Sequence, residues 1–479
     1  MATFATVNGT ALQGYAPTDA LYNEWYRYAV EYTRAQIEEV PGSGLILGVW
    51  VYNEIVYAFR NDTTGSRAYM YQATANGWEQ VTTPFLEPDG YYRFVNYNFY
   101  GHAGRVAMFG CDGVNQGFMF DGTTFTQIAT GMVNDAPTHL IAHKYHLFFA
   151  FSGGSLQHSA IGDPISWTPL TGASEIAVGH EITGLCAIPG EALAIFCRNA
   201  TYLLYGTSAV DWNLVTHSLQ AGAVENTVQD MHTPIYIDDF GMTSLEQTQN
   251  YGDFVTNSYS QRIKPVIDLN KPNTTTAMRV KSKDQYRVFF EGGVGIIAKR
   301  QSPTSWMFTR LSLPITVRRS CSMGSDTGSD MLFFSSDDGF VYQMDKGTSF
   351  DGAEIEALIR LPFNHMKSPR TIKGFKKAVM ELVAPEPVTL QFTPEFSYGN
   401  VDIPVSSTQD LLVQTGGGYW DSAIWDNFIW SAQSIGTAEA YVFGSGTNIS
   451  LVIRSLGTYE QPHTLQSVLL HYTQRGILT

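Results

Sequence analysis

The sequence is poor in charge, and it contains no long apolar run. Only 15% of its 479 residues are charged, against about 25% in an average soluble domain. No stretch approaches the roughly 18 consecutive apolar residues of a membrane-spanning helix, and no charged heptad repeat indicates a coiled coil. The first residues, MATFATVNGT, lack a basic stretch followed by an apolar one, so we expect no secretory signal.

Cysteine is scarce as well. The four cysteines, Cys111, Cys186, Cys197 and Cys321, form no C-x-x-C pair and have no histidine at a metal-ligand spacing. We therefore expect buried apolar thiols in a reducing compartment rather than disulfides or a zinc site.

Catalytic signatures are also missing. The chain contains no H-E-x-x-H, no G-x-x-x-x-G-K-[ST] and no G-x-S-x-G, which are the motifs of metalloproteases, phosphate-binding loops and serine hydrolases. His139 and His143 are spaced at i, i+4, but the strand pattern around them predicts a pair on one exposed sheet face rather than a metal site. We predict no catalytic residue, no cofactor and no bound metal.

What is present describes an all-β protein. Apolar residues make up 44% of the chain and aromatic residues 13%, together with 44 glycines, a composition typical of short strands joined by many turns. Strand pairs punctuated by glycine, asparagine and aspartate begin near residue 45, with GVWVYNEIVYAFRN (48–61) as the first.

Aromatic residues that follow the turns recur at intervals of roughly 45 residues, which is the period of propeller blades. The members of this series are Trp78, Phe125, Trp167, Trp212, Trp306 and Phe350. One interval is about twice as long, with Tyr259 near its middle. The pattern predicts a β-propeller of six or seven blades over 45–352. A string of β-sandwiches is the alternative, although sandwiches repeat nearer ~100 residues.

The two flanks differ from this repeat. In residues 1–44, Thr18 could cap a helix that places Leu21, Trp25, Tyr28, Ala29 and Tyr32 on one face, whereas the many aromatics also suit an extended arm. Strand patterns from residue 353 to 479 predict a C-terminal β-sandwich-like domain.

Two acidic segments deserve comparison with catalytic sites, because propellers can host glycosidases that use paired carboxylates. The segment SSDDGFVY (335–342) fits an aspartate-containing hairpin in which Asp337 tightens the turn. Asp238 and Asp239 precede a glycine and could bind Ca²⁺ or act as acid and base. We interpret both segments as turns in which aspartate bonds its own backbone.

Two further groups are candidates for contacts with other molecules. Lys367, Arg370, Lys373, Lys376 and Lys377 form a dense basic cluster that could contact DNA or another subunit, or simply form a solvated strand face. Trp420, Trp425 and Trp430 are spaced by an odd number, so on a strand they alternate between faces. This spacing favours interface or packing aromatics over a flat sugar platform.

Several stretches together resemble the tail hub, or nozzle, proteins of short-tailed bacteriophages, also called packaged-DNA stabilization proteins. LYNEWYRYAVEYT with VPGSGL is similar to the family's first segment. HKYHLFFAFSGGSLQHSAIGDPISW resembles one of its blades through Leu147, Ser159, Gly162, Asp163, Pro164 and Trp167. Residues 181–206 and 235–267 are similar to later blades, and IRLPFNHMKSPRTIKGFKKAVMEL and WDSAIWDNFIW resemble parts of its C-terminal domain.

This resemblance implies a non-enzymatic virion protein, assembled in the host cytoplasm and located in the tail. Such proteins form a homohexameric ring below the portal and adaptor, extend the DNA channel and retain the packaged genome until ejection. The implied partners are the head-to-tail adaptor, tail fibre, spike or needle proteins, and double-stranded genomic DNA in the lumen, with no membrane insertion by this chain. The N-terminal segment would contact the adaptor or another subunit.

The acidic balance agrees with this expectation on independent grounds. The chain has 29 Lys+Arg and 44 Asp+Glu, a net charge of −15, so its surface as a whole is not built to hold DNA phosphates. Two other functions stay open from the residues alone. One is a propeller glycosidase or depolymerase acting on cell-surface glycan, and the other is a scaffold propeller that binds proteins.

Overall fold

The computed structural model describes residues 28–100, 104–188, 192–245, 258–302, 305–384, 388–399, 408–413, 435–457 and 462–477. The chain divides into two compact units, each with its own core. One unit is Ile37–Asp345, and the other joins the N-terminal residues up to Gln36 to Lys346–Thr479. The first unit ends at 345, against the expected propeller end at 352.

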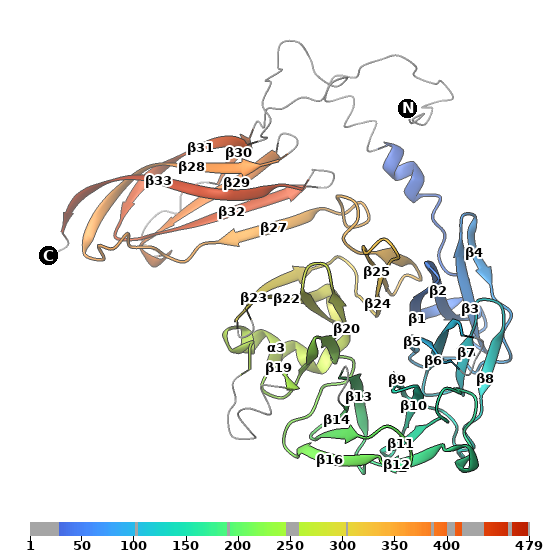
Figure 1. Ribbon diagram of the computed structural model, residues 1–479. Helices are drawn as coiled ribbons and strands as arrows, with labels where there is room; N and C mark the ends of the chain where they lie inside the picture. The colour runs from blue at the N-terminus through green and yellow to red at the C-terminus, as the bar shows by residue number, and fades with distance from the viewer. Residues whose placement is uncertain are drawn as a thin grey trace, which may run out of the picture. The chain divides into compact units, whose positions relative to one another are not determined.

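Residues 37–345 form a β-propeller (Figure 1). Their described part contains seven antiparallel sheets, and each sheet runs in chain order from its innermost to its outermost strand. The first four sheets are β1 (Ser43–Tyr52), β2 (Ile55–Asn61), β3 (Ala68–Thr74) and β4 (Gly77–Gln80); β5 (Arg93–Asn98), β6 (Val106–Cys111), β7 (Gly117–Phe120) and β8 (Phe125–Ile128); β9 (His139–His143), β10 (His146–Phe151), β11 (Ser155–His158) and β12 (Ser174–Ala177); and β13 (Ile182–Ala187), β14 (Leu193–Cys197), β15 (Thr201–Tyr205) and β16 (Asn213–Ser218).

The remaining three sheets complete the ring. They are β17 (Gln229–Met231), β18 (Thr233–Ile237) and β19 (Met242–Ser244); β20 (Thr274–Val280), β21 (Gln285–Phe290), β22 (Val294–Ser302) and β23 (Ser305–Ser312); and β24 (Arg319–Gly324), β25 (Asp330–Ser335) and β26 (Val341–Gln343). Short helices occur at η1 (Pro169–Thr171), η3 (Gln261–Ile263), α3 (Lys264–Asn270), η4 (Lys271–Asn273) and η5 (Glu291–Gly293).

The innermost strands begin about every 45 residues, so the prediction of an all-β propeller with six or seven blades is confirmed, with seven. Trp78, Phe125 and Trp306 lie in the outermost strands β4, β8 and β23, and Trp212 directly precedes β16. Trp167 lies in the loop before η1, where its ring stacks on Phe149, with ring centroids 5.1 Å apart. Phe350 lies beyond residue 345 and marks no blade.

Several middle strands of the blades are buried along their whole length rather than on alternate residues. Every residue of β7, β10 and β14 is buried, because neighbouring blades cover both faces of each sheet. The outermost strands are more exposed, as in β16. This stacking accounts for the high apolar and low charged fractions of the chain.

Val40 joins the last blade to the first. Its backbone N–H donates to the carbonyl of Gly339, in the turn between β25 and β26 (3.0 Å). Its own carbonyl accepts from the guanidinium of Arg60 in β2. Arg60 also donates to the carbonyl of Gly44 (3.0 Å) and pairs with Glu39 (3.0 Å). The ring is therefore closed by one buried arginine and the segment before β1, and β1 also contacts β24.

The second unit contains a two-sheet β-sandwich. One sheet has the order β27-β32-β29-β30 and the other β31-β28-β33, and their inner faces share one core. The strands are β27 (Ile355–Arg360), β28 (Thr371–Val383), β29 (Val388–Phe396), β30 (Gln409–Val413), β31 (Ile435–Gly446), β32 (Ile449–Gly457) and β33 (Thr464–Ile477), with η6 (Ser397–Gly399) after β29.

Residues 28–34 are helical, so the described end of the expected N-terminal helix has the predicted conformation. Arg34 of this segment forms an ion pair with Asp351 of the same unit (2.7 Å). Thr18, Leu21 and Trp25 lie outside the described residues. In the described part of the chain, no helix has both the length and the apolar character needed to cross a membrane.

Candidate functional site

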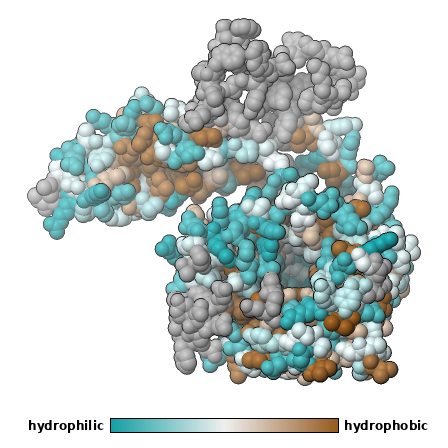
Figure 2. All heavy atoms as spheres, in the orientation of Figure 1, coloured by the Kyte–Doolittle hydropathy of each residue, from teal (hydrophilic) through white to brown (hydrophobic). Residues whose placement is uncertain are grey.

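A cavity of about 550 Å³ lies on the axis of the propeller, where the innermost strands of all seven sheets meet. The space-filling view shows a hollow at the centre of the propeller (Figure 2). Because every sheet starts with its innermost strand, residues that begin these strands gather at the same end of the cavity.

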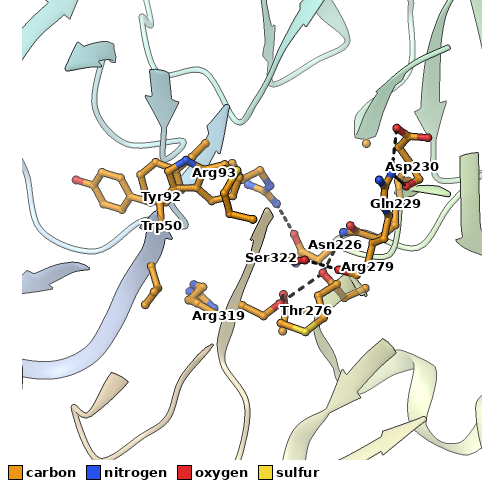
Figure 3. Close-up of a pocket in the computed structure, with 18 of the residues that line it drawn as sticks. Trp50, Tyr92, Arg93, Asn226, Gln229, Asp230, Thr276, Arg279, Arg319 and Ser322 are labelled. Atoms are coloured by element: carbon orange, nitrogen blue, oxygen red, sulfur yellow. Dashed lines mark hydrogen bonds and ion pairs between the residues drawn. The ribbon is translucent and has the colours of Figure 1, made fainter. Parts of the chain in front are cut away.

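The cavity wall is positively charged, although the chain as a whole is acidic. Four cationic side chains and two carboxylates of the described residues line it, namely Arg93, Arg279, Lys281 and Arg319, and Asp230 and Asp330. Most of the other lining groups are neutral, and they include the aromatic rings of Trp50, Tyr91 and Tyr92 (Figure 3).

Arg93 and Arg319 occupy equivalent places in the repeat, as the first residues of β5 and β24. Arg93 donates to Asn226 (2.7 Å) (Figure 3). It also donates to the carbonyl of Thr138 (2.8 Å), and it pairs with Glu225 (2.6 Å). Its guanidinium is thus held from two other parts of the ring, the segment before β9 and the segment before β17.

Arg319 is held differently, by backbone and by an aromatic ring. Its Nε donates to the carbonyl of Leu47 (3.0 Å), and one terminal nitrogen donates to the carbonyl of Arg318 (3.1 Å). Its guanidinium carbon lies 3.8 Å from the centroid of the Tyr91 ring, and that of Arg93 lies 4.3 Å from the same centroid. One ring therefore contacts two cations.

Tyr91 crosses the cavity. Its hydroxyl donates to the carbonyl of Thr275 in the sixth sheet (3.4 Å), although Tyr91 itself lies two residues before β5 of the second sheet. These two sheets are not neighbours in the ring, so the side chain spans from one wall to another.

The electrostatics of this end shift two pKa values. Burial lowers the pKa of His139 well below its usual range, and the charge of Arg93 acts in the same direction. Burial also lowers the pKa of Arg319, where Tyr91 opposes the shift and Arg93 and Arg318 add to it. A neutral His139 next to two cations fits a site with excess positive charge.

At the other end, the lining charges sum to zero, with Arg279 and Lys281 against Asp230 and Asp330. Arg279 donates to both the carbonyl and the carboxylate of Asp230, and Asp330 accepts from the backbone N–H of Ser282 (2.8 Å). Both carboxylates that line the cavity therefore have bonding partners. The uncompensated charge lies at the end lined by Arg93 and Arg319.

Sequence reasoning missed this site, apart from singling out His139 for another reason. The sequence does contain a pattern that indicates the site, because an arginine begins the innermost strand of two blades, at Arg93 and at Arg319. It becomes visible only when the blades are aligned on strands rather than on the aromatic residues of the turns.

Both acidic segments singled out in the sequence are turns, but in 335–342 the aspartate that bonds the local backbone is Asp338, which accepts from the N–H of Phe340 (3.1 Å), and not Asp337. Asp238 accepts from the backbone N–H groups of Phe240 (2.7 Å) and Gly241 (2.8 Å), and Asp239 pairs with Arg198. Asp337 pairs with Arg318 (2.6 Å) in the turn before β26. None of these aspartates lines the cavity. Among the described residues, no group of three or more histidine, cysteine or acidic residues could hold a metal ion.

The basic cluster is divided by the fold of the second unit. Lys373 is fully buried, and its ammonium donates to the carbonyls of Ser368 (2.6 Å), Thr371 (2.9 Å) and Thr447 (2.9 Å). The expectation that Lys373 contacts DNA or another subunit is therefore wrong, because its ammonium is already enclosed by protein.

The other four members of the cluster stay candidates. Lys367, Arg370 and Lys376 are exposed, and Lys377 pairs with Glu439 on β31 (2.8 Å). Trp420, Trp425 and Trp430, the proposed interface aromatics, lie outside the described residues.

The prediction of an exposed histidine pair is also wrong. His139 and His143 are both buried, because the next blade covers this face of β9. His143 lies near His146, His158 and Trp212 in a group of packed rings. The four cysteines are buried, as expected, and unpaired.

We expect the propeller to lose stability between pH 6.5 and about 4. Burial lowers the pKa of both His143 and His158 to about 4. The charges of Lys144 and His146 lower the pKa of His143 further, and the charge of His146 lowers that of His158. The unfolded chain binds these protons near pH 6.5 and the folded chain only near 4, so stability falls as pH drops through this window. Each group contributes up to roughly 3 kcal/mol.

Thermal melting at pH 7.5 and pH 4.5 tests this expectation. His158→Gln should reduce the pH dependence of the melting temperature, whereas His180→Gln, at an exposed position of the same unit, should leave it unchanged. A wild-type melting temperature that is the same at both pH values contradicts the prediction.

Comparisons with known proteins identify only similar β-propeller folds. No family model matches the chain, and no curated protein matches it. Similar solved structures include one of YCF48 bound to a D1 peptide (10% identity, TM-score 0.39, covering 64% of this chain and 93% of that chain). Others are a chain of the mitotic checkpoint complex (12%, 0.41, 65% and 93%) and the WD40 β-propeller domain of Doa1 (8%, 0.38, 64% and 94%).

Proposed function

We propose that this chain is a structural protein of a short-tailed bacteriophage virion. In this proposal it is the subunit of a homohexameric tail nozzle, a ring that extends the DNA channel below the portal and adaptor and retains the genome until ejection. The resemblance of several sequence stretches to the nozzle family suggests this role, and the following features of the fold support it.

The observation that carries the proposal is an exposed aromatic face on the β31-β28-β33 sheet. Phe443 is 82% exposed and Tyr441 61% exposed, and their rings stack on each other with centroids 6.0 Å apart. They alternate along β31 with the buried Ala440 and Val442, so they lie on the side of the sheet away from its core. Leu469 on β33 is exposed on the same side, opposite Val379.

Such a face is costly to leave in water. Stacked exposed aromatics together with leucine are enriched where subunits meet and are uncommon on an isolated surface. In the space-filling view, hydrophobic residues spread over the visible side of this domain (Figure 2). We assign the face to a second copy of the chain, because the ring that we propose needs a contact repeated in every subunit.

The strand β27 offers a second contact region. It pairs only with β32 among the described residues, which makes it the edge of its sheet. Leu358 (59%) and Ile359 (45%) are both exposed there. An exposed apolar edge strand of this kind is a template for another chain, and here we propose that it faces a neighbouring subunit or the adaptor.

The propeller axis itself is no path for DNA. Its cavity measures about 550 Å³ and is crossed by Tyr91, so a duplex cannot pass. The proposed DNA channel is therefore the lumen between the copies. The net charge of −15 per copy suits a lumen through which a duplex slides without being held.

We propose no catalytic activity for the chain. The two carboxylates that line the cavity are engaged with Arg279 and with a backbone amide, whereas a glycosidase needs one free acid and one free base or nucleophile. The proposed partners are the adaptor and the fibre, spike or needle proteins of the tail.

A stop codon in the reading frame of this chain tests the proposal in the parent phage. We expect heads that package DNA and then lose it, with infectivity restored by the wild-type chain supplied from a plasmid. Particles that keep their genome and infect without the chain would overturn the proposal. So would hydrolysis of host surface glycan by the purified chain.

A further inference from the structure

The axial cavity of the propeller has an unbalanced cation at one end. In the described part of the chain, no carboxylate lies within ion-pair distance of Arg319. Its guanidinium is satisfied only by two backbone carbonyls and the Tyr91 ring. A partly buried cation without a counter-charge is unfavourable unless an anionic ligand balances its charge.

A second cation makes this imbalance larger. Arg93 contacts the same Tyr91 ring, so two like charges converge on one small region of the cavity wall. Arg93 does have a carboxylate partner, Glu225, but that side chain is more than half exposed and lies at the rim. An anion bound in the cavity at Arg319 would neutralise that cation, and an oxygen that also reaches Arg93 would compete with Glu225.

Neutral polar groups make up much of the wall around these two cations. Thr276 and Ser320 line the wall, and their hydroxyls are hydrogen-bonded to each other (2.8 Å). Asn226 contacts Arg93 from the same side (Figure 3). The volume of about 550 Å³ falls within the roughly 300–1,000 Å³ of small-molecule sites.

We propose that this cavity binds the oxyanion of a small acidic molecule, a carboxylate or a phosphate group, at Arg319 and next to Arg93. Arginine presents two parallel N–H groups to such an oxyanion, and this geometry is the strongest hydrogen-bonding arrangement available to a side chain. Trp50 and Tyr92 line the adjoining wall, so the remainder of the ligand has aromatic surface to pack on. This inference does not depend on the tail-nozzle proposal.

Isothermal titration of the full chain tests the site, at constant ionic strength maintained with chloride. The probes are inorganic phosphate, acetate, and glucuronate as a carboxylate on a sugar ring. We expect saturable binding of one equivalent per chain. Tighter binding of phosphate identifies a phosphate ligand, and tighter binding of glucuronate identifies a carboxylate with a bulky remainder.

Three variants decide whether the binding occurs in the cavity. Arg319→Gln should weaken it at least tenfold. Glu225→Gln should tighten it several-fold, because the competing carboxylate is removed while the fold keeps its hydrogen bond. Arg310→Gln, an exposed arginine on the outer strand β23, removes the same charge elsewhere and should change nothing.

The opposing results are equally clear. No saturable binding of any of the three probes overturns the proposal. Binding that falls equally in Arg319→Gln and Arg310→Gln reflects net charge alone and also overturns it. Because Arg319→Gln could disturb the contact with Leu47, Glu225→Gln serves as the independent variant, and unchanged affinity there contradicts the site.

Discussion

Arg60→Ala should lower the free energy of unfolding of the propeller by about 3 kcal/mol, because it leaves the buried carbonyl of Val40 and that of Gly44 without a donor. For a unit of this size, the change corresponds to roughly 5 °C in melting temperature. The first and last blades share no strand; an apolar cluster and the Val40–Gly339 bond connect them, and Arg60 fixes Val40 in place for that bond. Arg310→Ala, at an exposed position, should stay within about 0.5 kcal/mol of wild type.

Gly339 provides a matched test of the same contact. A Cβ added there would lie 2.5 Å from both terminal nitrogens of Arg60. Gly328 has the same φ of +83° but nothing within 4 Å of its added Cβ, so Gly328→Ala carries only the backbone cost, about 1 kcal/mol.

Gly339→Ala should therefore cost clearly more than Gly328→Ala, and the excess should vanish in an Arg60→Ala background. Chemical denaturation of the four variants measures this coupling. Equal costs at the two glycines, or an additive double variant, would contradict closure through Arg60.

The double variant Phe443→Asp, Tyr441→Asp should convert the assembled protein to monomers. Both side chains are exposed, so the fold should survive, while each subunit contact loses two aromatic anchors and gains two desolvated charges. A loss of about 3 kcal/mol per contact corresponds to more than 100-fold in association. Mass photometry across a concentration series measures the effect.

Leu170→Asp is the control for this variant, because Leu170 is also fully exposed but lies in the propeller, in η1. It should assemble like wild type. An aromatic double variant that assembles normally, or a wild-type chain that stays monomeric at micromolar concentration, would argue against a subunit contact on this face.

The repeat could be predicted from sequence because every blade packs its sheet against its two neighbours in the same way. Turn residues and outer-strand aromatics such as Trp78 and Trp306 recur once in each of several blades, so their spacing gives the length of one blade even without a structure. The apolar middle strands, such as β7, are consistent with burial on both faces but carry no alternation from which to predict a sheet.

Exposure of individual side chains could not be predicted in the same way. His139 and His143 lie on a sheet face that one blade alone would expose, and the next blade buries it. The sequence places Lys373 in a dense basic cluster, yet three carbonyls, two near the start of β28 and one in the turn between β31 and β32, enclose its ammonium. Both outcomes depend on contacts between segments far apart in sequence.

The axial cavity shows the same difficulty for function. Arg93, Arg319 and Tyr91 come from the second and seventh blades, and no local motif joins them. Their convergence follows from ring closure, which is a property of the whole propeller.

Cryo-electron microscopy of the parent virion tests the central proposal most directly. The account predicts six copies of a seven-bladed propeller with its β-sandwich, arranged as a ring below the portal and adaptor, with DNA in the lumen between copies and the aromatic face of β31 buried against a neighbouring subunit. A virion in which this chain occurs only in peripheral spikes, or does not surround the DNA channel, would contradict it.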